Sequence, residues 1–241
     1  MGAIGGLASG GVEFGRAVVA EPVAKRQPPR WAGFPFAFSH NAVVAGASAS
    51  PAAVPELVRP LIVTLDEFWM HIEAVKREAP SVEVVPRLLT RRLGQLPENE
   101  IVDFSNHFRD CLNRSNDGCL WVAASVMMGG CGDDSFDYFR GWLIAQGQRV
   151  FEAVLAEPDS MAELDCIPHD PRSARLEEML GVVADAYQHR TGSEDFEILR
   201  TRPLHGTRNL DFLRLSEKEE LELFPKLAAR FPETPHTSPF T

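Results

Sequence analysis

The sequence MMGGCGDDSFDYFRGWLIAQGQRVFEAVLAEPDSMAEL spans residues 127–164 and contains the helix break around which we expect the chain to pack. The preceding run, Gly118–Met128, is apolar almost all round, which is typical of a helix in the middle of a bundle. Gly129 and Gly130 end it. Apolar residues then recur every three or four positions over 133–146, which predicts a second helix that stops at Gly147.

Upstream of this break, the sequence predicts three helices. Residues 64–67 read TLDE, a capping box in which the Thr64 hydroxyl and the Glu67 carboxylate satisfy free amides at a helix start. Helical spacing of apolar residues continues to Pro80. A shorter helix is expected around 86–93, and a longer one begins near Pro97.

Downstream, helical turns are expected around 150–155, and a long helix over about 173–190 closed by Gly192. Periodicity lapses over 193–215 before Ser216 begins a second capping box. No β-branched alternation lasts long enough to predict a sheet. We therefore predict an all-α fold, with residues 61–231 forming a single multi-helix bundle.

Residues 1–60 differ from this body, because they are rich in Gly, Ala, Val, Pro and Ser and lack any sustained period. Such a stretch buries too little apolar surface to offset its ordering entropy. We therefore expect a disordered arm over 1–60, and a frayed tail over 232–241.

The formal net charge is −10, and residues 1–60 hold only five basic and three acidic side chains of the 24 and 34 in the chain. The acidic body repels a phosphate backbone, so we expect no nucleic-acid partner. No apolar run approaches the roughly 18 residues of a spanning helix, so we expect no membrane partner. Four cysteines without a CxxC pair, and no export signal, favour reduced thiols and a cytoplasmic location.

The densest acidic group is Asp133, Asp134 and Asp137. Asp133 or Asp134 suits the N-cap of the helix after the glycine break, and acidic residues favour its positive end. Asp137 is spaced to pair with Arg140 three residues later. This interpretation gives the three carboxylates a structural role and no metal.

Two alternatives remain open for this corner. The three aspartates, Arg140 and Trp142 could form the rim of a small-molecule or peptide site. The DDxxD pattern is also that of terpene synthases, in which helical carboxylates hold Mg²⁺ against a diphosphate. The sequence has no second metal motif of that kind, so we expect no cofactor.

A second candidate site is the only cluster of basic residues in the acidic body. It consists of Arg200, Arg202, His205 and Arg208. Arginine matches carboxylate and phosphate bidentately, so this cluster is a secondary anion-binding candidate. In the competing interpretation, these cations offset acidic neighbours over 194–197. His71 and His107, at the edges of apolar stripes, are expected to be hydrogen-bonded boundary residues.

Several of these segments resemble the bacterial family called domain of unknown function 4240. The segments are TLDEFWMHI at 64–72, LWVAA at 120–124, GGCGDDSFDYFRGWLI at 129–144, EPD at 157–159 and the helix through Ala186-Tyr187. The likeness covers roughly residues 61–192, extending at most to about 230. It implies a helical domain and brings no established activity.

The sequence leaves open whether the protein is an enzyme, since it shows no GxSxG elbow and no P-loop or Rossmann glycine motif. We expect a non-catalytic domain that binds a protein or a small molecule. Its acidic surface suits a basic partner. The alternative is a Mg²⁺-dependent hydrolase or transferase that uses Asp133, Asp134 and Asp137.

Overall fold

The computed structural model of the protein describes residues 63–209, 211–212 and 215–232. The predicted arm (1–60) and all but the first residue of the predicted tail lie outside these residues. Over the described residues there is no β-strand, and the all-α prediction is confirmed. In this part of the chain no helix is both long and apolar enough to cross a bilayer.

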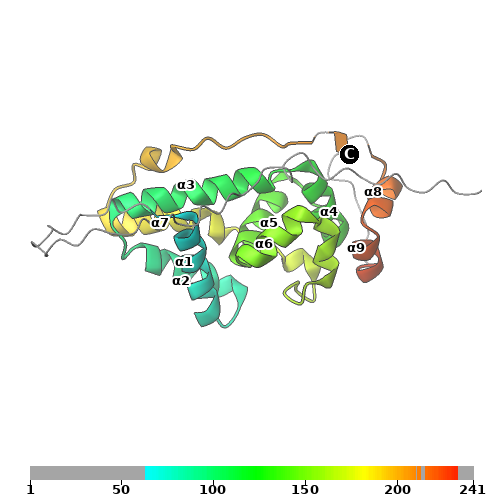
Figure 1. Cartoon of the computed structure of the whole chain (residues 1–241), viewed down its shortest axis with the longest axis horizontal. Helices are drawn as coiled ribbons and strands as arrows, with labels where there is room; N and C mark the ends of the chain where they lie inside the picture. Colours follow the sequence, from blue (N-terminus) through cyan, green and yellow to red (C-terminus); the bar gives the residue numbers. More distant parts are fainter. Residues whose placement is uncertain (1–62, 210, 213–214, 233–241) are drawn as a thin grey trace, which may run out of the picture. The chain divides into compact units, whose positions relative to one another are not determined.

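The helices follow one another without a repeat (Figure 1). The α-helices are α1 (Leu65–Glu78), α2 (Val85–Leu93), α3 (Glu98–Ser115), α4 (Gly118–Met128), α5 (Asp133–Ala145), α6 (Gln148–Ala156), α7 (Glu178–Thr191), α8 (Glu217–Leu223) and α9 (Pro225–Arg230). Short 3-10 helices are η2 (Val82–Val84), η3 (Pro158–Glu163), η4 (Pro171–Ser173) and η5 (Glu197–Arg200).

Several helix ends follow the capping residues that the sequence predicts. The Thr64 hydroxyl accepts a hydrogen bond from the Glu67 amide, and the Glu67 carboxylate accepts one from the Thr64 amide. Ser216 begins α8 with the same arrangement. Gly129 and Gly192 end α4 and α7 in the left-handed conformation, with φ of 75° and 72°, which costs glycine no steric strain.

Two helix starts differ from the prediction. Gly132 is the N-cap of α5, and no side chain caps that end, so the expectation of an Asp133 or Asp134 cap is wrong. Both aspartates lie in the first turn, where their charge still favours the positive helix end. α7 begins at Glu178 rather than near 173, because Pro171–Ser173 forms η4, with Asp170 as its cap.

The core surrounds α4, in which every residue except Cys119 is buried. This helix contacts α5, α8, α9, η3 and η4, as its apolar sequence predicts. The Trp121 ring stacks on Phe136 of α5 with ring centroids 4.9 Å apart, and its Nε1 donates to the Cys131 carbonyl at 2.6 Å. Burial of each large aromatic side chain stabilises the fold by about 2 kcal/mol or more.

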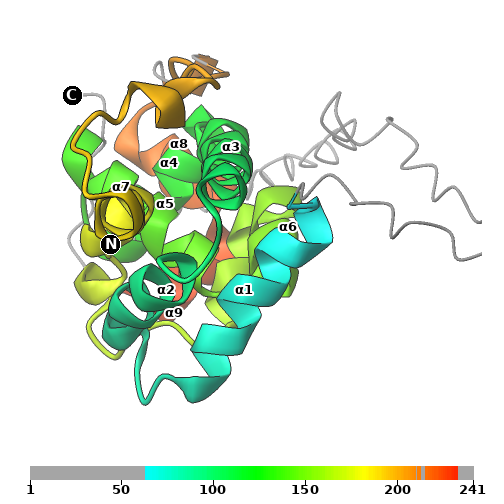
Figure 2. The same cartoon turned by 90° about the vertical axis from the view of Figure 1, so that its left-hand side faces the viewer.

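A second group of contacts forms around α7, which packs against α2, α3 and α5; Figure 2 shows these three helices around it. The approach of α5 to α7 requires glycine at position 141. A Cβ there would lie 2.9 Å from the Leu176 carbonyl oxygen and 3.2 Å from Met179 Cβ. At this point α5 therefore lies close to the backbone just before α7 and to the first turn of α7.

The two boundary histidines are hydrogen-bonded, as predicted. Arg92 of α2 donates through Nε to His71 Nδ1 of α1 at 2.9 Å. Burial, and next the Arg92 charge, lower the pKa of His71, so the ring is held neutral. His107 Nε2 lies 2.8 Å from the Val63 carbonyl oxygen. These rings therefore connect elements of the fold.

We expect Gly141→Ala and Gly181→Ala to change stability in opposite directions. Alanine is favoured over glycine within a helix by about 0.8–1 kcal/mol. At Gly141 the added methyl meets the Leu176 carbonyl, and overpacking of this kind costs about 1–3 kcal/mol. At Gly181 the atom nearest to the added methyl is Asp185 Oδ2 at 3.7 Å, so the stability gained from the helix preference of alanine remains.

Urea unfolding followed by circular dichroism measures both free energies. A Gly141→Ala protein more stable than the wild type would contradict the close contact between α5 and α7.

Candidate functional site

The segment that lacks periodicity in the sequence has a defined path in the structure. We call residues 196–209 the strap. After α7 ends, the strap runs along α3 in the same direction as that helix and reaches the start of α4 (Figure 1). Several of its backbone carbonyls and one amide are bonded to side chains of α3 and its C-cap.

Four polar residues of α3 and its C-cap make these bonds, and we call Ser105, Arg109, Asn113 and Asn116 the polar row. Their spacing of four, four and three residues places them on one face of the helix. The Ser105 hydroxyl donates to the Leu199 carbonyl at 3.0 Å, and Arg109 Nε donates to the Arg202 carbonyl. This row holds the first half of the strap.

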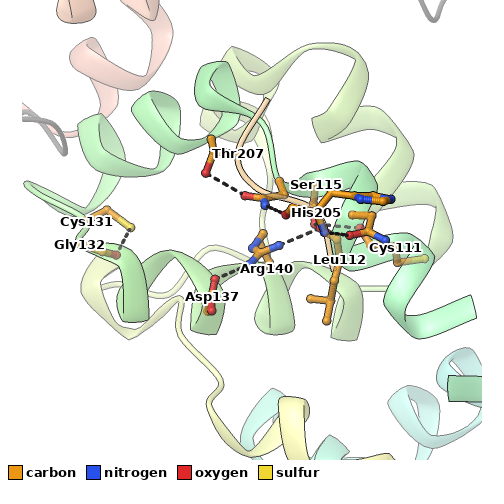
Figure 3. A network of polar contacts seen from close by, with 11 residues as sticks. Cys111, Leu112, Ser115, Cys131, Gly132, Asp137, Arg140, His205 and Thr207 are labelled. Carbon is orange, nitrogen blue, oxygen red and sulfur yellow. Dashed lines mark hydrogen bonds and ion pairs between the residues drawn. The ribbon is translucent and has the colours of Figure 1, made fainter. Parts of the chain in front are cut away.

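The two asparagines hold the second half. Asn113 Nδ2 donates to the Pro203 carbonyl at 2.9 Å, and its Oδ1 accepts from the His205 amide at 2.8 Å. Asn116 Nδ2 donates to the His205 carbonyl at 2.6 Å, and its own carbonyl accepts from the Arg208 amide at 3.0 Å. Figure 3 shows His205 and Thr207 beside the end of α3.

A pocket of about 260 Å³ lies between the strap and the helices α3, α5 and α7. Its volume is slightly below the roughly 300–1,000 Å³ that is usual for small-molecule sites. The wall is mostly apolar, with a few charged groups at defined places. The lining residues are Ser105, Phe108, Arg109, Leu112, Asp137, Arg140, Leu180, Val183, Ala184, Phe196, Leu199, Arg200 and Leu204.

Arg140 of α5 is the buried charge of the pocket wall, with only 7% of its surface exposed. Its Nη1 donates to the Leu112 carbonyl at 2.8 Å and its Nη2 donates to Asp137, as Figure 3 shows. The guanidinium carbon also lies 5.2 Å from the Phe136 ring centroid, a cation–π distance. The buried Nε has no hydrogen-bond partner among the described residues.

Two further arginines line the pocket from opposite sides. Arg109 comes from α3, and Arg200 comes from the strap. Partial burial, and next the nearby Arg200 charge, lower the pKa of Arg109. With Arg140 and Asp137 these side chains give the pocket three positive groups and one negative group, in a chain whose formal net charge is −10.

The structure places the predicted acidic corner as follows. The Asp137–Arg140 ion pair is present, as predicted from its spacing. Asp133 and Asp134 are exposed in the first turn of α5 and do not line the pocket. Within the described residues, His, Cys, Asp and Glu side chains form no group of three or more that could hold a metal ion.

Trp142, the remaining candidate at this corner, is fully buried. Its ring centroid lies 5.8 Å from that of Phe139 in the same helix, so it belongs to the core and not to a rim. Tryptophan at helical spacing beside a core phenylalanine faces the protein interior.

The basic cluster divides between two roles. Arg200 lines the pocket and forms a 2.9 Å ion pair with Glu197, as the charge-offset interpretation expects. Arg202 lies 4.0 Å from Asp110, and its carbonyl accepts from Arg109. His205 and Arg208 bind the polar row through their backbone. The four residues therefore do not converge on one anion.

Sequence reasoning missed Arg109 and Ser105, because both lie on the polar face of an amphipathic helix. The only available signal was the row of polar residues at spacings of four, four and three on α3. That row faces the strap, although its residue types are also typical of a solvated face.

The four cysteines are free. Burial raises the pKa of Cys111 and of Cys131 to about 12, so both remain protonated at neutral pH. Buried thiols of this kind are unreactive core side chains, as predicted for cysteines without a close pair.

The described residues thus form an all-helical domain, and the strap covers a pocket between three of its helices. The family described as Protein of unknown function (DUF4240) matches residues 63–189, and the chain belongs to this family. No curated protein and no solved structure matches the chain. The match runs from α1 into α7, so it includes the helical walls of the pocket but not the strap.

We expect Asp137→Ala to lower the melting temperature by several degrees. The substitution leaves the buried Arg140 guanidinium without its carboxylate, and loss of a charged hydrogen-bond partner costs roughly 1–3 kcal/mol. Asp134→Ala is the matched control, because Asp134 is exposed in the same helix and contributes to the dipole by at most about 1 kcal/mol. Thermal unfolding curves of the two variants that coincide with the wild type would contradict a stabilising Asp137–Arg140 pair.

Proposed function

We propose that this domain is a non-catalytic binding module for a small molecule, which it holds in the pocket between α3, α5, α7 and the strap. The observation that supports this proposal is the convergence of apolar walls on a few fixed charged groups. Ligand sites usually combine a mostly apolar lining with a few placed polar groups.

The charged groups are oriented before any ligand arrives. Arg140 is fixed by the Leu112 carbonyl and by Asp137, and Arg109 is fixed by its bond to the Arg202 carbonyl. Groups that are already held lose little freedom on binding, so more of the interaction energy contributes to affinity.

The arrangement favours binding over catalysis for a chemical reason. Acid–base or nucleophilic catalysis needs a group that can exchange a proton or attack at neutral pH. Among the described residues, the ionisable side chains of the pocket wall are three arginines and Asp137, whose Oδ1 is bound by Arg140. Arginine stays protonated in proteins, so it serves recognition rather than proton transfer.

Filling the pocket tests the proposal. Ala184 of α7 lines it, so we expect Ala184→Phe to abolish one-to-one binding of prodan, a neutral dye whose emission reports a shielded apolar site. Ala153→Phe is the matched control, because Ala153 is exposed on α6 and is not part of the pocket.

Prodan fluorescence titrations of the full chain measure the binding, and circular dichroism melts confirm folding. If Ala184→Phe unfolds, Ala184→Leu takes its place, because leucine fills less of the pocket. Saturable binding that survives both fillings, or no saturable binding to the wild type, would contradict the proposal.

A further inference from the structure

The charges of the pocket do not balance one another, and the imbalance is localised. Arg140 pairs with Asp137, and Arg200 pairs with Glu197 at 2.9 Å. Arg109 has no ion pair among the described residues, and its charge lies near that of Arg200. One positive charge at the pocket wall is therefore left without a counter-ion.

The guanidinium of Arg109 is held in a way that leaves its outer end available. Its Nε donates to the Arg202 carbonyl of the strap, which fixes the plane of the group. Its two terminal nitrogens have no hydrogen bond to a described residue. A fixed arginine with both terminal nitrogens available matches the two oxygens of a carboxylate in a bidentate pair.

The rest of the pocket suits an apolar body. Phe108 and Leu112 on α3 face Leu180 and Val183 on α7, and Leu199 of the strap adds a further apolar wall. Displacing water from such walls favours an aliphatic or aromatic group. The volume of about 260 Å³ limits that group to a short chain or a single ring.

We propose that the pocket binds an apolar monocarboxylate, with the carboxylate on Arg109 and the apolar body between α3, α7 and the strap. This inference rests on the proposed binding function and adds the chemical class of the ligand. A single negative charge balances Arg109, whereas a phosphate dianion exceeds that charge. A neutral ligand leaves Arg109 without a partner.

The depressed pKa of Arg109 agrees with this assignment, because the pKa falls through burial and through repulsion from Arg200. A carboxylate bound beside both cations would offset both effects. The buried Nε of Arg140, which has no hydrogen-bond partner among the described residues, is a further donor on the wall of the same pocket.

Calorimetric titration of the full-length protein with four ligands of equal alkyl length tests the chemical class of the ligand. The ligands are octanoate, octan-1-ol, octyl phosphate and octylammonium. We expect octanoate to bind one to one and roughly ten-fold or more tighter than octan-1-ol, since charged hydrogen bonds contribute about 1.5–3 kcal/mol. 3-Phenylpropanoate distinguishes a ring from a chain as the apolar body.

Substitution of the arginines locates the carboxylate. Arg109→Gln is expected to weaken octanoate by roughly 10–100-fold and octan-1-ol by much less, because loss of the bond to the strap affects both ligands, whereas loss of the guanidinium affects only the carboxylate. Arg109→Lys keeps the charge without the two-pronged geometry, so an intermediate loss is expected. Arg87→Gln, at an exposed site on α2, is the control.

A second pair of variants covers the case in which Arg109→Gln unfolds. These variants are Arg200→Gln and Arg202→Gln. Arg200 lines the pocket, whereas Arg202, two residues away, is exposed and does not line it. Only Arg200→Gln is expected to change octanoate affinity, by a few-fold, because its charge is exposed and screened.

Octan-1-ol or octyl phosphate binding as tightly as octanoate would overturn the monocarboxylate assignment. So would an unchanged octanoate affinity in folded Arg109→Gln. If prodan still binds in a manner sensitive to Ala184→Phe, the binding function stands and only the ligand class fails. If neither prodan nor any octyl ligand binds, the binding function itself fails.

Discussion

The hydrogen bonds from the polar row of α3 to the backbone of the strap are the constraint on which the pocket depends. Beyond η5 the strap has no helical hydrogen bonds of its own, and within the described residues no strand lies beside it, so its backbone polar groups need other partners. Asn113 provides one donor and one acceptor, and Asn116 continues the pattern toward α4. Without these bonds, the strap side chains Leu199 and Leu204 would not cover the cavity.

The same row also explains why the pocket can hold charge inside an acidic protein. Arg109 belongs to the row, and its bond to the strap fixes its guanidinium against the cavity. Arg140 enters from α5 with its own carbonyl and carboxylate partners. The site thus places positive groups against apolar walls, in a chain with excess negative charge elsewhere.

The helices were largely predictable from sequence, because their signals are local. The capping boxes at Thr64 and Ser216, the glycines that end α4 and α7, and the apolar run of α4 all act within a few residues. The N-cap of α5 was predicted wrongly. Glycine and aspartate both serve as N-caps, and the extended backbone at Gly132 decides between them.

The strap and most of the site could not be predicted, since their partners lie some 90 residues apart in the chain. An asparagine on a polar helix face has the same sequence pattern whether it meets water or a backbone. The Asp137–Arg140 pair was predictable because it lies within one helical turn. The role of Arg109 was not predictable, because it depends on the contact of Arg109 with the strap.

Amide hydrogen exchange across residues 199–209, in the wild type and in Asn113→Ala, tests the central role of the polar row most directly. In the wild type the His205 and Arg208 amides donate to Asn113 and Asn116, so we expect these two amides to exchange slowly. In Asn113→Ala we expect the His205 amide to exchange markedly faster while the core of α4 remains protected. Wild-type exchange as fast as in an unfolded peptide, or no change in the variant, would contradict the account.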